Sequence, residues 1–380
     1  MVDFENLSLT RAPLSLFLCS SLSRLLPPSG SFGVTKKAKA GRLGVSGRPL
    51  FYRSQRDPFA PCVGWSGSAP WGMLAALFAA TFFALSASCA SRSLRHFGPA
   101  RANLGRLVVA TLVLGAFAHT AGGGLGSAST GWFLLSGIIG MGLGDLALFA
   151  ALPRLGSRLT VLILQCLAAP LAAVGEWLWL GTRISADQVL WGTVILAGVA
   201  LALSPERGGE RIAGGGAALG FAFLAACGQG FGALVSRKGV QVAEAAGELV
   251  GNATFGLTAA YQRILAGLLF TALWFAVQGR WGRTAESPWA PYRHPGAGNP
   301  PGAGWGWMVA NGLAGAVIGV SCYQWALATT PSGLVLPIAA TAPLLAMPIA
   351  YWLEGDRPGK RAILGGLVAV AGCIALARAR

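Results

Sequence analysis

The sequence predicts an all-α integral membrane protein with ten transmembrane helices arranged as two inverted five-helix repeats. Two observations predict this class. First, 54% of the 380 residues are hydrophobic and 11% are charged, whereas soluble domains contain about 25% charged residues. Second, the second half of the chain repeats the first half in apolar segments long enough to span a bilayer. The 55 glycines fit the same class, because small residues let membrane helices approach closely.

The internal repeat can be followed residue by residue. Residues 132–152 align with residues 307–327 at an offset of 175, and residues 181–198 align with residues 355–372 at an offset of 174. Glycines recur at matching places in the third and eighth segments, where Gly137, Gly140 and Gly144 match Gly312, Gly315 and Gly319. We predict that these six glycines lie where helices pack against one another.

Ten apolar segments, most of them about 17 to 23 residues long, have the length that a spanning helix needs. The first repeat contributes residues 72–90, 104–120, 131–152, 159–180 and 188–203. The second repeat contributes residues 216–236, 260–278, 305–327, 333–353 and 362–377. Because five is an odd number, the two repeats must enter the membrane from opposite sides, so the repeat is an inverted one.

The remaining residues form an extension, a linker and loops. Residues 1–71 are basic and proline-rich, with nine Lys and Arg, which predicts disorder. A start-site artefact is the alternative, because Met73 opens the first apolar segment. The repeats at 72–204 and 216–380 are joined by a linker at 205–215. A surface helix is predicted after residue 236. The positive-inside rule gives opposite orientations for the extension and for the later loops, so the orientation stays open.

Charge and motifs exclude several classes of function. The net charge of +16 would suggest nucleic acid in a soluble protein, but here the basic residues are scattered through loops and the extension. They are better explained as topology signals and headgroup contacts, so we expect a lipid bilayer and no nucleic acid as partner. The seven cysteines form no CxxC pair, and no Walker loop or HExxH motif occurs. We therefore expect no cofactor, no metal site and no enzymatic activity.

A local pattern begins in the third segment with Gly144-Asp145 and continues with Ala151-Leu152 and a basic residue at 158. Pro170 follows inside the fourth segment, and Leu180-Gly181-Thr182-Arg183 forms the next turn. In this order the chain resembles the EamA-like transporters of the drug/metabolite transporter superfamily, over roughly residues 73–380. The family usually has a glutamate where this chain has Thr182. The resemblance implies a membrane transporter and does not name a substrate.

Two carboxylates fall inside predicted helices. A charge near the bilayer centre costs at least about 2.5–3.5 kcal/mol on insertion scales, so both are functional candidates. Asp145 lies well inside its segment, where we predict that it faces a packed interface or a cavity. It would contact substrate or a coupling ion there, or form a structural hydrogen bond or salt bridge. Glu176 lies about one turn before the end of its segment, from which it could reach the headgroup region. Val320 takes the place of Asp145 in the second repeat, which excludes a symmetric carboxylate pair.

Two arginines occupy equivalent places in the two repeats, Arg106 at the predicted start of the second segment and Arg263 at that of the seventh. Such arginines usually extend to the membrane interface. The alternative is a gate residue, or a counter-ion for an anionic substrate.

Prolines and polar side chains mark a second set of candidates. Proline removes a backbone donor, which is tolerated where the backbone lines a cavity, and it can also make a kink that only shapes packing. Pro170, Pro337, Pro343 and Pro348 are the prolines concerned. Nearby side chains could line a path or bond from helix to helix: Gln165, Asn311, Tyr323, Gln324, Trp325 and Thr341.

These features predict a secondary transporter of the inner (plasma) membrane. It would move a small metabolite, amino-acid-like compound or amphiphile by alternating access, as an exporter or exchanger. Asp145 is the strongest single candidate for coupling or substrate contact. We expect one central cavity between the repeats, with its charge supplied mainly by the first. A membrane-embedded enzyme or lipid flippase and a non-transporting scaffold are the alternatives, and a homodimer is left open.

Overall fold

The computed structural model describes residues 69–204, 215–281, 303–354 and 359–379, all within the unit Val63–Arg380. Every element in these ranges is a helix, and ten of the helical stretches are long and apolar enough to cross a membrane. The predicted all-α membrane fold is confirmed. The predicted extension and linker lie outside the described residues, apart from residues 69–71 and 215, which begin helices.

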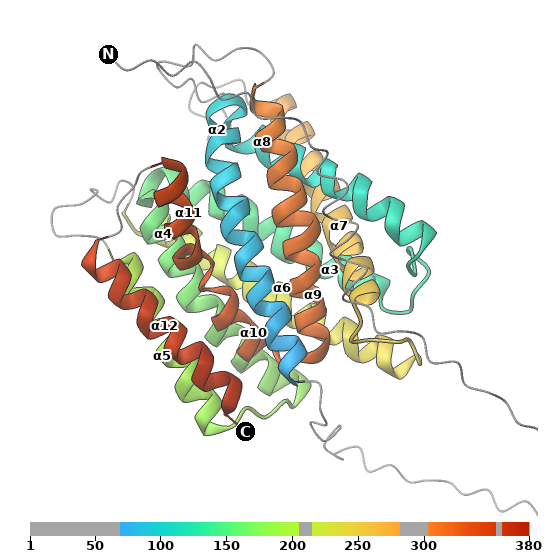
Figure 1. Cartoon of the computed structure of the whole chain (residues 1–380). Coiled ribbons are helices and arrows are strands. Elements are labelled where there is room, and N and C mark those ends of the chain that lie inside the picture. The colour runs from blue at the N-terminus through green and yellow to red at the C-terminus, as the bar shows by residue number, and fades with distance from the viewer. Residues whose placement is uncertain (1–68, 205–214, 282–302, 355–358, 380) are drawn as a thin grey trace, which may run out of the picture. The chain divides into compact units, whose positions relative to one another are not determined.

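The two repeats contain matching series of helices (Figure 1). The first comprises α2 Ala69–Thr120, α3 Thr130–Gly137, the π-helix η1 Ile138–Gly144, α4 Asp145–Gly175, the π-helix η2 Glu176–Leu180 and α5 Ala186–Leu203. The second comprises α6 Gly215–Ala245, α7 Ala253–Trp281, α8 Ala303–Asn311, the π-helix η3 Gly312–Gly319, α9 Val320–Thr329, α10 Ser332–Ala339, α11 Ala342–Glu354 and α12 Lys360–Arg378. The π-helices η1 and η3 fall at matching places of the repeat.

Several boundaries differ from the sequence prediction, and α4 Asp145–Gly175, for example, runs from the third predicted segment into the fourth. The first two predicted segments belong to one helix, α2, which bends between its two spans (Figure 1). Helix α6 continues to Ala245, so the predicted surface helix after residue 236 is the end of α6. Helix α7 begins at Ala253 rather than at residue 260. Its start is set by Asn252, whose Oδ1 accepts a hydrogen bond from Phe255 N at 2.7 Å and so caps the first turn.

Successive spans run in alternating directions, which gives the bundle two ends. The "Thr120 end" is where the spans finishing at Thr120, Leu180, Ala245 and Thr329 terminate. The "Ala90 end" is where those finishing at Ala90, Leu148, Leu203 and Val277 terminate. Contacts across the bundle agree with this division, because Gly72 packs on Thr330 at the Thr120 end and Gly304 on His96 at the Ala90 end.

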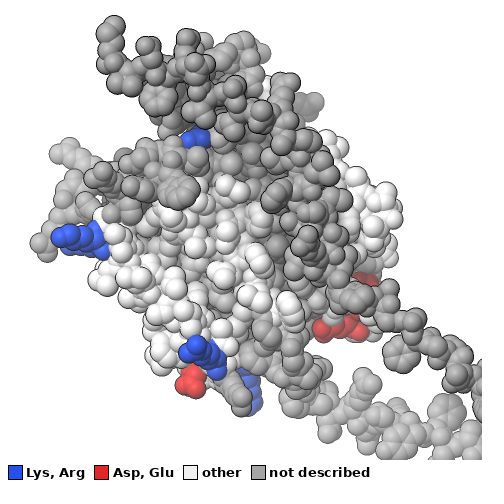
Figure 2. All heavy atoms as spheres, viewed as in Figure 1, with Lys and Arg blue, Asp and Glu red and all other residues white. Residues whose placement is uncertain are grey.

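Most of the packing joins one repeat to the other. Helix α4 packs along α6, α5 along α12, and α2 against α8, η3 and α7. Large apolar side chains such as Leu112, Leu178 and Leu273 are exposed, as expected of surfaces that face lipid. Where described residues are visible in Figure 2, charged side chains lie toward the edges of the molecule, and the surface between them is uncharged.

Candidate functional site

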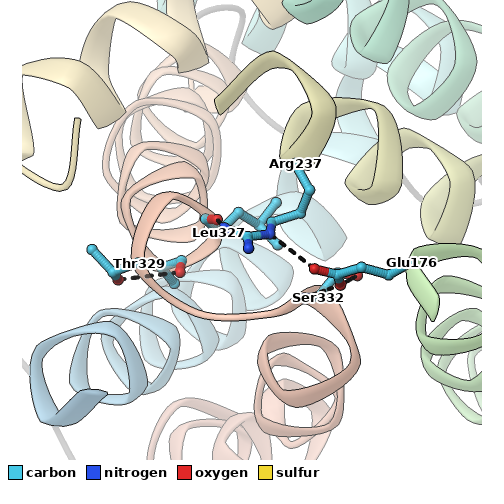
Figure 3. A network of polar contacts seen from close by, with 6 residues as sticks. Glu176, Arg237, Leu327, Thr329 and Ser332 are labelled. Carbon is cyan, nitrogen blue, oxygen red and sulfur yellow. Dashed lines mark hydrogen bonds and ion pairs between the residues drawn. The ribbon is translucent and has the colours of Figure 1, made fainter. Parts of the chain in front are cut away.

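A buried ionic network lies toward the Thr120 end (Figure 3). Glu176 is 0% exposed, and Arg237 Nε donates to its Oε1 at 3.0 Å. Ser332 donates to Oε2 both from its backbone N, at 2.6 Å, and from its hydroxyl. Arg237 Nη1 also donates to the Leu327 carbonyl at 2.6 Å. We call these four residues the Glu176 network. It joins η2 of the first repeat to α6, α9 and α10 of the second.

The prediction that Glu176 reaches the headgroup region is wrong. Its carboxylate points into the bundle, where the amide N–H groups of the first turn of α10 have no partner within their own helix. A carboxylate at such a helix start is stabilised by these donors and by the helix dipole. The guanidinium of Arg237 supplies the opposite charge that a buried carboxylate needs.

The second ion pair lies toward the Ala90 end. Arg106 Nη2 donates to Asp145 Oδ2 at 3.0 Å, and Arg106 Nε donates to Asn103 Oδ1 at 2.6 Å. The two charged side chains are 22% and 20% exposed. The geometry is the local salt bridge that was one of two interpretations of Asp145, and Arg106 bonds inside the protein instead of extending to the interface. Both partners belong to the first repeat.

Arg263 lies in the body of α7, at a depth in the bundle between those of the two ion pairs. It is 5% exposed. Its Nη1 donates one long hydrogen bond to Ser236 Oγ, at 3.5 Å, and its Nε has no partner among the described residues. Its Cζ lies 5.8 Å from the centre of the Tyr323 ring. The prediction that Arg263 starts its helix and extends to the interface is wrong, because α7 begins at Ala253.

Other polar side chains around Arg263 also contain atoms that have no hydrogen-bond partner among the described residues. Tyr323 Oη and Gln324 Oε1 are buried without a hydrogen bond within the described part of the chain. Gln324 Nε2 donates to Ser236 Oγ at 3.3 Å, and Ser236 Oγ also bonds Ser136 Oγ at 2.7 Å. We call Arg263, Ser236, Tyr323 and Gln324 the Arg263 cluster. It unites α6, α7 and α9 of the second repeat.

The other polar candidates form ordinary internal hydrogen bonds. Gln229 Nε2 donates to Gln165 Oε1 at 3.1 Å, and Ser86 Oγ donates to Asn311 Oδ1 at 2.6 Å. Both bonds join one repeat to the other. The remaining two candidates bond backbone carbonyls: Trp325 Nε1 with Gly251 at 2.7 Å and Thr341 Oγ1 with Ile338 at 2.7 Å.

The four prolines have different surroundings. Pro170 lies within the continuous helix α4. In the ninth span, Pro337 lies near the end of α10, Pro343 in the first turn of α11 and Pro348 within α11. The span is interrupted between α10 and α11, at residues 340–341. A first turn tolerates proline because its N–H would have no helical partner there.

The repeated glycines all lie at close helix contacts. A Cβ on Gly137 would collide with the backbone oxygen of Arg263, and one on Gly312 would lie 3.1 Å from the backbone oxygen of Arg106. Gly140 lies against the Arg263 side chain. The remaining three pack on residues of the first span of the opposite repeat: Gly144 on Gly228, Gly315 on Ser86 and Gly319 on Phe83.

A cavity of about 510 Å³ lies beside α4, α5 and α10. Its lining is mostly apolar and includes Pro170, Thr182, Gly192 and Pro337. None of the charged residues of the two ion pairs lines it. The charged residue in its lining is Arg183 of the first repeat, whereas Arg237 and Arg263, which lie deeper in the bundle, both come from the second repeat.

Sequence reasoning missed three side chains of these clusters, Arg237, Ser332 and Ser236, and also Gln229, the partner of Gln165. The sequence prediction places Arg237 outside the sixth span, in the connection that follows residue 236, because the apolar segment ends at the residue before it. The need of a buried carboxylate for a cation was a signal that could have pointed to it. Gln229 is polar within an apolar segment and was open to the same argument as Gln165.

An inverted duplication of five apolar helices, with buried ion pairs and an interrupted ninth span, defines a multi-pass membrane protein of the kind found among secondary transporters. The EamA-like transporter family matches residues 70–204 and again residues 217–378. The chain therefore belongs to the EamA-like transporter family, a family of membrane transporters in the drug/metabolite transporter superfamily.

Comparison with other proteins shows that a solved structure has a similar fold. A search of curated proteins found no match. A solved crystal structure of a protein is similar to this chain with a TM-score of 0.59 and 19% sequence identity, over 81% of this chain and 97% of the other. At this identity the similarity shows the fold alone.

Proposed function

We propose that this protein is a secondary transporter that moves a small metabolite, amino-acid-like compound or amphiphile by alternating access. It acts as an exporter or exchanger in the inner (plasma) membrane, driven by a gradient. The observation that carries the proposal is that, among the described residues, an ion pair joins the repeats at the Thr120 end and none joins them at the Ala90 end, where the cross-repeat contacts include those of Arg92 with Trp307 and of Phe97 with Trp305. The Glu176 network links both repeats at the Thr120 end. The Arg106–Asp145 pair at the Ala90 end lies within one repeat.

This difference between the ends supports a cycle in which the two ends open in turn. In the present arrangement the Glu176 network holds the repeats together at the Thr120 end. Opening that end separates Glu176 from Arg237 and Ser332, and water admitted there solvates both charges, which offsets the loss of the buried ion pair. The interruption between α10 and α11 supports this motion, because the helix segment carrying Ser332 can tilt independently of α11.

Asp145 remains the proposed residue for coupling or substrate contact. Its carboxylate is partly exposed and already bonded to Arg106, so a proton or a substrate cation would compete with that arginine for it. The proposed partners are a small-molecule substrate and the lipid bilayer, with no nucleic acid, and a homodimer is part of the proposal.

Transport by purified protein in lipid vesicles tests the proposal. A panel of metabolites is offered under an imposed proton or sodium gradient, and flux is compared with that of protein-free vesicles. The Glu176→Gln variant is expected to lose at least about tenfold in flux. Glu244→Gln neutralises an exposed carboxylate on α6, the helix that carries Arg237, and is expected to match the wild type. Absence of flux for every compound, with folded protein, would favour a non-transporting scaffold.

Accessibility at the Thr120 end provides a second measurement. A cysteine at Thr330, which is fully buried there, is introduced into a background without other cysteines. With Glu176→Gln, this cysteine is expected to react faster with a membrane-impermeant maleimide, because the end opens more often. An unchanged labelling rate would contradict the role of the Glu176 network in closing that end.

A further inference from the structure

Arg263 and Arg106 are equivalent by the repeat, but they differ in their partners. Each presents its backbone oxygen to a repeated glycine of the opposite half, Arg263 to Gly137 and Arg106 to Gly312. Arg106 has a carboxylate in Asp145. The residue that matches Asp145 by the repeat is Val320. The second arginine therefore lacks the anion that the first one has.

Asp145 is near enough to attract the charge of Arg263, but its carboxylate is already bonded to Arg106. Of the two ion pairs between described residues, neither includes Arg263. Its one hydrogen bond to a described residue is at the outer limit of such bonds, 3.5 Å to Ser236 Oγ, and its buried Nε has no partner among those residues. A buried charge without a partner is costly, and a guanidinium presents five donors in a fork that fits a carboxylate or a phosphate.

We propose that Arg263 binds the carboxylate group of the transported compound, an inference that rests on the proposed function and names its substrate class. Because Asp145 is near enough to attract both arginines, the charges of Arg106, Asp145 and Arg263 act together, and they sum to one positive charge. A carboxylate neutralises that charge, whereas a doubly charged phosphate would leave a net negative charge in a medium of low dielectric constant. The balance therefore favours a small monocarboxylate over a phosphate.

The rest of the Arg263 cluster supplies complementary groups. Tyr323 Oη is buried near the guanidinium and has an unused O–H with which to donate to a carboxylate oxygen. Gln324 Oε1 is an unused acceptor on the next residue, suited to a hydroxyl or amine on the same compound. Gly140 and Gly232 let the guanidinium pack directly against two helix backbones, because a Cβ on Gly140 or Gly232 would lie 2.5 or 3.1 Å from Nη2.

Access to this site requires the helices to separate, because Arg263 is 5% exposed. The guanidinium lies between Gly232 of the second repeat and Gly140 of the first. A compound that enters from either end would therefore meet Arg263 at the boundary between the repeats. In an alternating-access cycle this boundary is the place that both ends reach in turn.

Ligand-dependent thermal stability of the purified full chain in detergent tests the proposal. Lactate and phenylacetate are compared with lactamide and phenylacetamide, which have the same shape without the charge, and with inorganic phosphate. At least one carboxylate is expected to raise Tm in a concentration-dependent manner, with little effect of the amides and phosphate. Arg263→Gln should weaken this carboxylate binding by about tenfold to a hundredfold, as expected for loss of a charged hydrogen-bonded partner.

Two further variants separate binding from folding. Tyr323→Phe removes a hydroxyl that has no partner in the described chain, so Tm without ligand should stay unchanged while carboxylate affinity falls several-fold. Arg101→Gln removes an exposed arginine and should leave carboxylate binding as in the wild type. If Arg263→Gln proves unstable, Tyr323→Phe still reports on the site.

Each other outcome overturns the proposal. Stabilisation by amides as strong as by carboxylates, stronger stabilisation by phosphate, no stabilisation by either carboxylate, or unchanged binding in Arg263→Gln would each do so. Failure of the proposed function looks different. In that case vesicles show no flux for any compound, while the Arg263-dependent stabilisation by carboxylate is still observed.

Discussion

The two repeats share their backbone packing and differ in the charges that they place inside the bundle. Gly137 and Gly312 lie against the backbones of two equivalent arginines. In the first repeat the arginine is paired with Asp145, and in the second Val320 takes the matching position, so Arg263 forms no ion pair with a described residue. Glycine contacts thus specify how the helices approach, because a single added Cβ would disrupt them. The charged residues were free to diverge, so the chemistry of the bundle is asymmetric on a symmetric scaffold.

The largest expected effect comes from Glu176, where a carboxylate of the first repeat meets charges of the second. Glu176→Gln should lower the free energy of unfolding by about 3–5 kcal/mol, because it leaves Arg237 as an uncompensated buried cation. The double variant with Arg237→Gln should be less destabilised than the sum of the single variants. Denaturation in detergent measures both. A loss below about 1 kcal/mol in Glu176→Gln would show that the network contributes little to cohesion.

The next test compares two glycines that are equivalent by the repeat. An added methyl group would clash more severely at Gly137 than at Gly312. In Gly137→Ala the new methyl group would overlap the backbone oxygen of Arg263, which cannot rotate away, and about 2–3 kcal/mol should be lost. In Gly312→Ala the nearest atoms are 3.1 Å away and include the side chain of Val109, so about 1 kcal/mol is expected.

Thermal unfolding of the two alanine variants checks their order. Gly216→Ala is the control, because a Cβ there would meet no atom within 4 Å. Equal losses at Gly137 and Gly312 would mean that the repeats pack with the same tolerance, contrary to the geometry.

The sequence predicts the fold far better than it predicts the clusters of polar residues. Apolar length and repeated glycines are local properties that predict the ten spans, and the local pattern that begins at Gly144-Asp145 predicts the family. Partners such as Glu176 and Ser332 lie 156 positions apart in the chain. They meet because η2 turns one face toward the start of α10, and neither face is specified by the residues near Glu176. The end of α6 differs from the prediction because Arg237 interrupts the apolar pattern, although its side chain is partly buried in the bundle.

The next prediction concerns Asp145, the carboxylate of the first repeat whose matching position in the second repeat is occupied by Val320. Asp145→Asn should cost about 1 kcal/mol of stability, since the pair with Arg106 is partly exposed and Asn103 remains as a partner. If Asp145 couples or contacts the substrate, vesicle flux should fall by at least about tenfold at normal expression. Unchanged flux would assign Asp145 a purely structural role.

The smallest expected effect concerns the starts of α5 and α12, which match at an offset of 174. Ser185 caps α5, because its side chain accepts from Gln188 N at 3.3 Å while Gln188 Oε1 accepts from Ser185 N at 3.1 Å. The matching residue before α12 is Gly359, which makes no side-chain cap, in an extended backbone that serine can also adopt. Ser185→Ala should therefore cost about 1 kcal/mol, and Gly359→Ser should gain a few tenths. Thermal unfolding of the two variants and of the pair measures this. A destabilised Gly359→Ser protein would mean that the second repeat uses glycine there for close approach, so that the repeats would differ in packing as well as in charge.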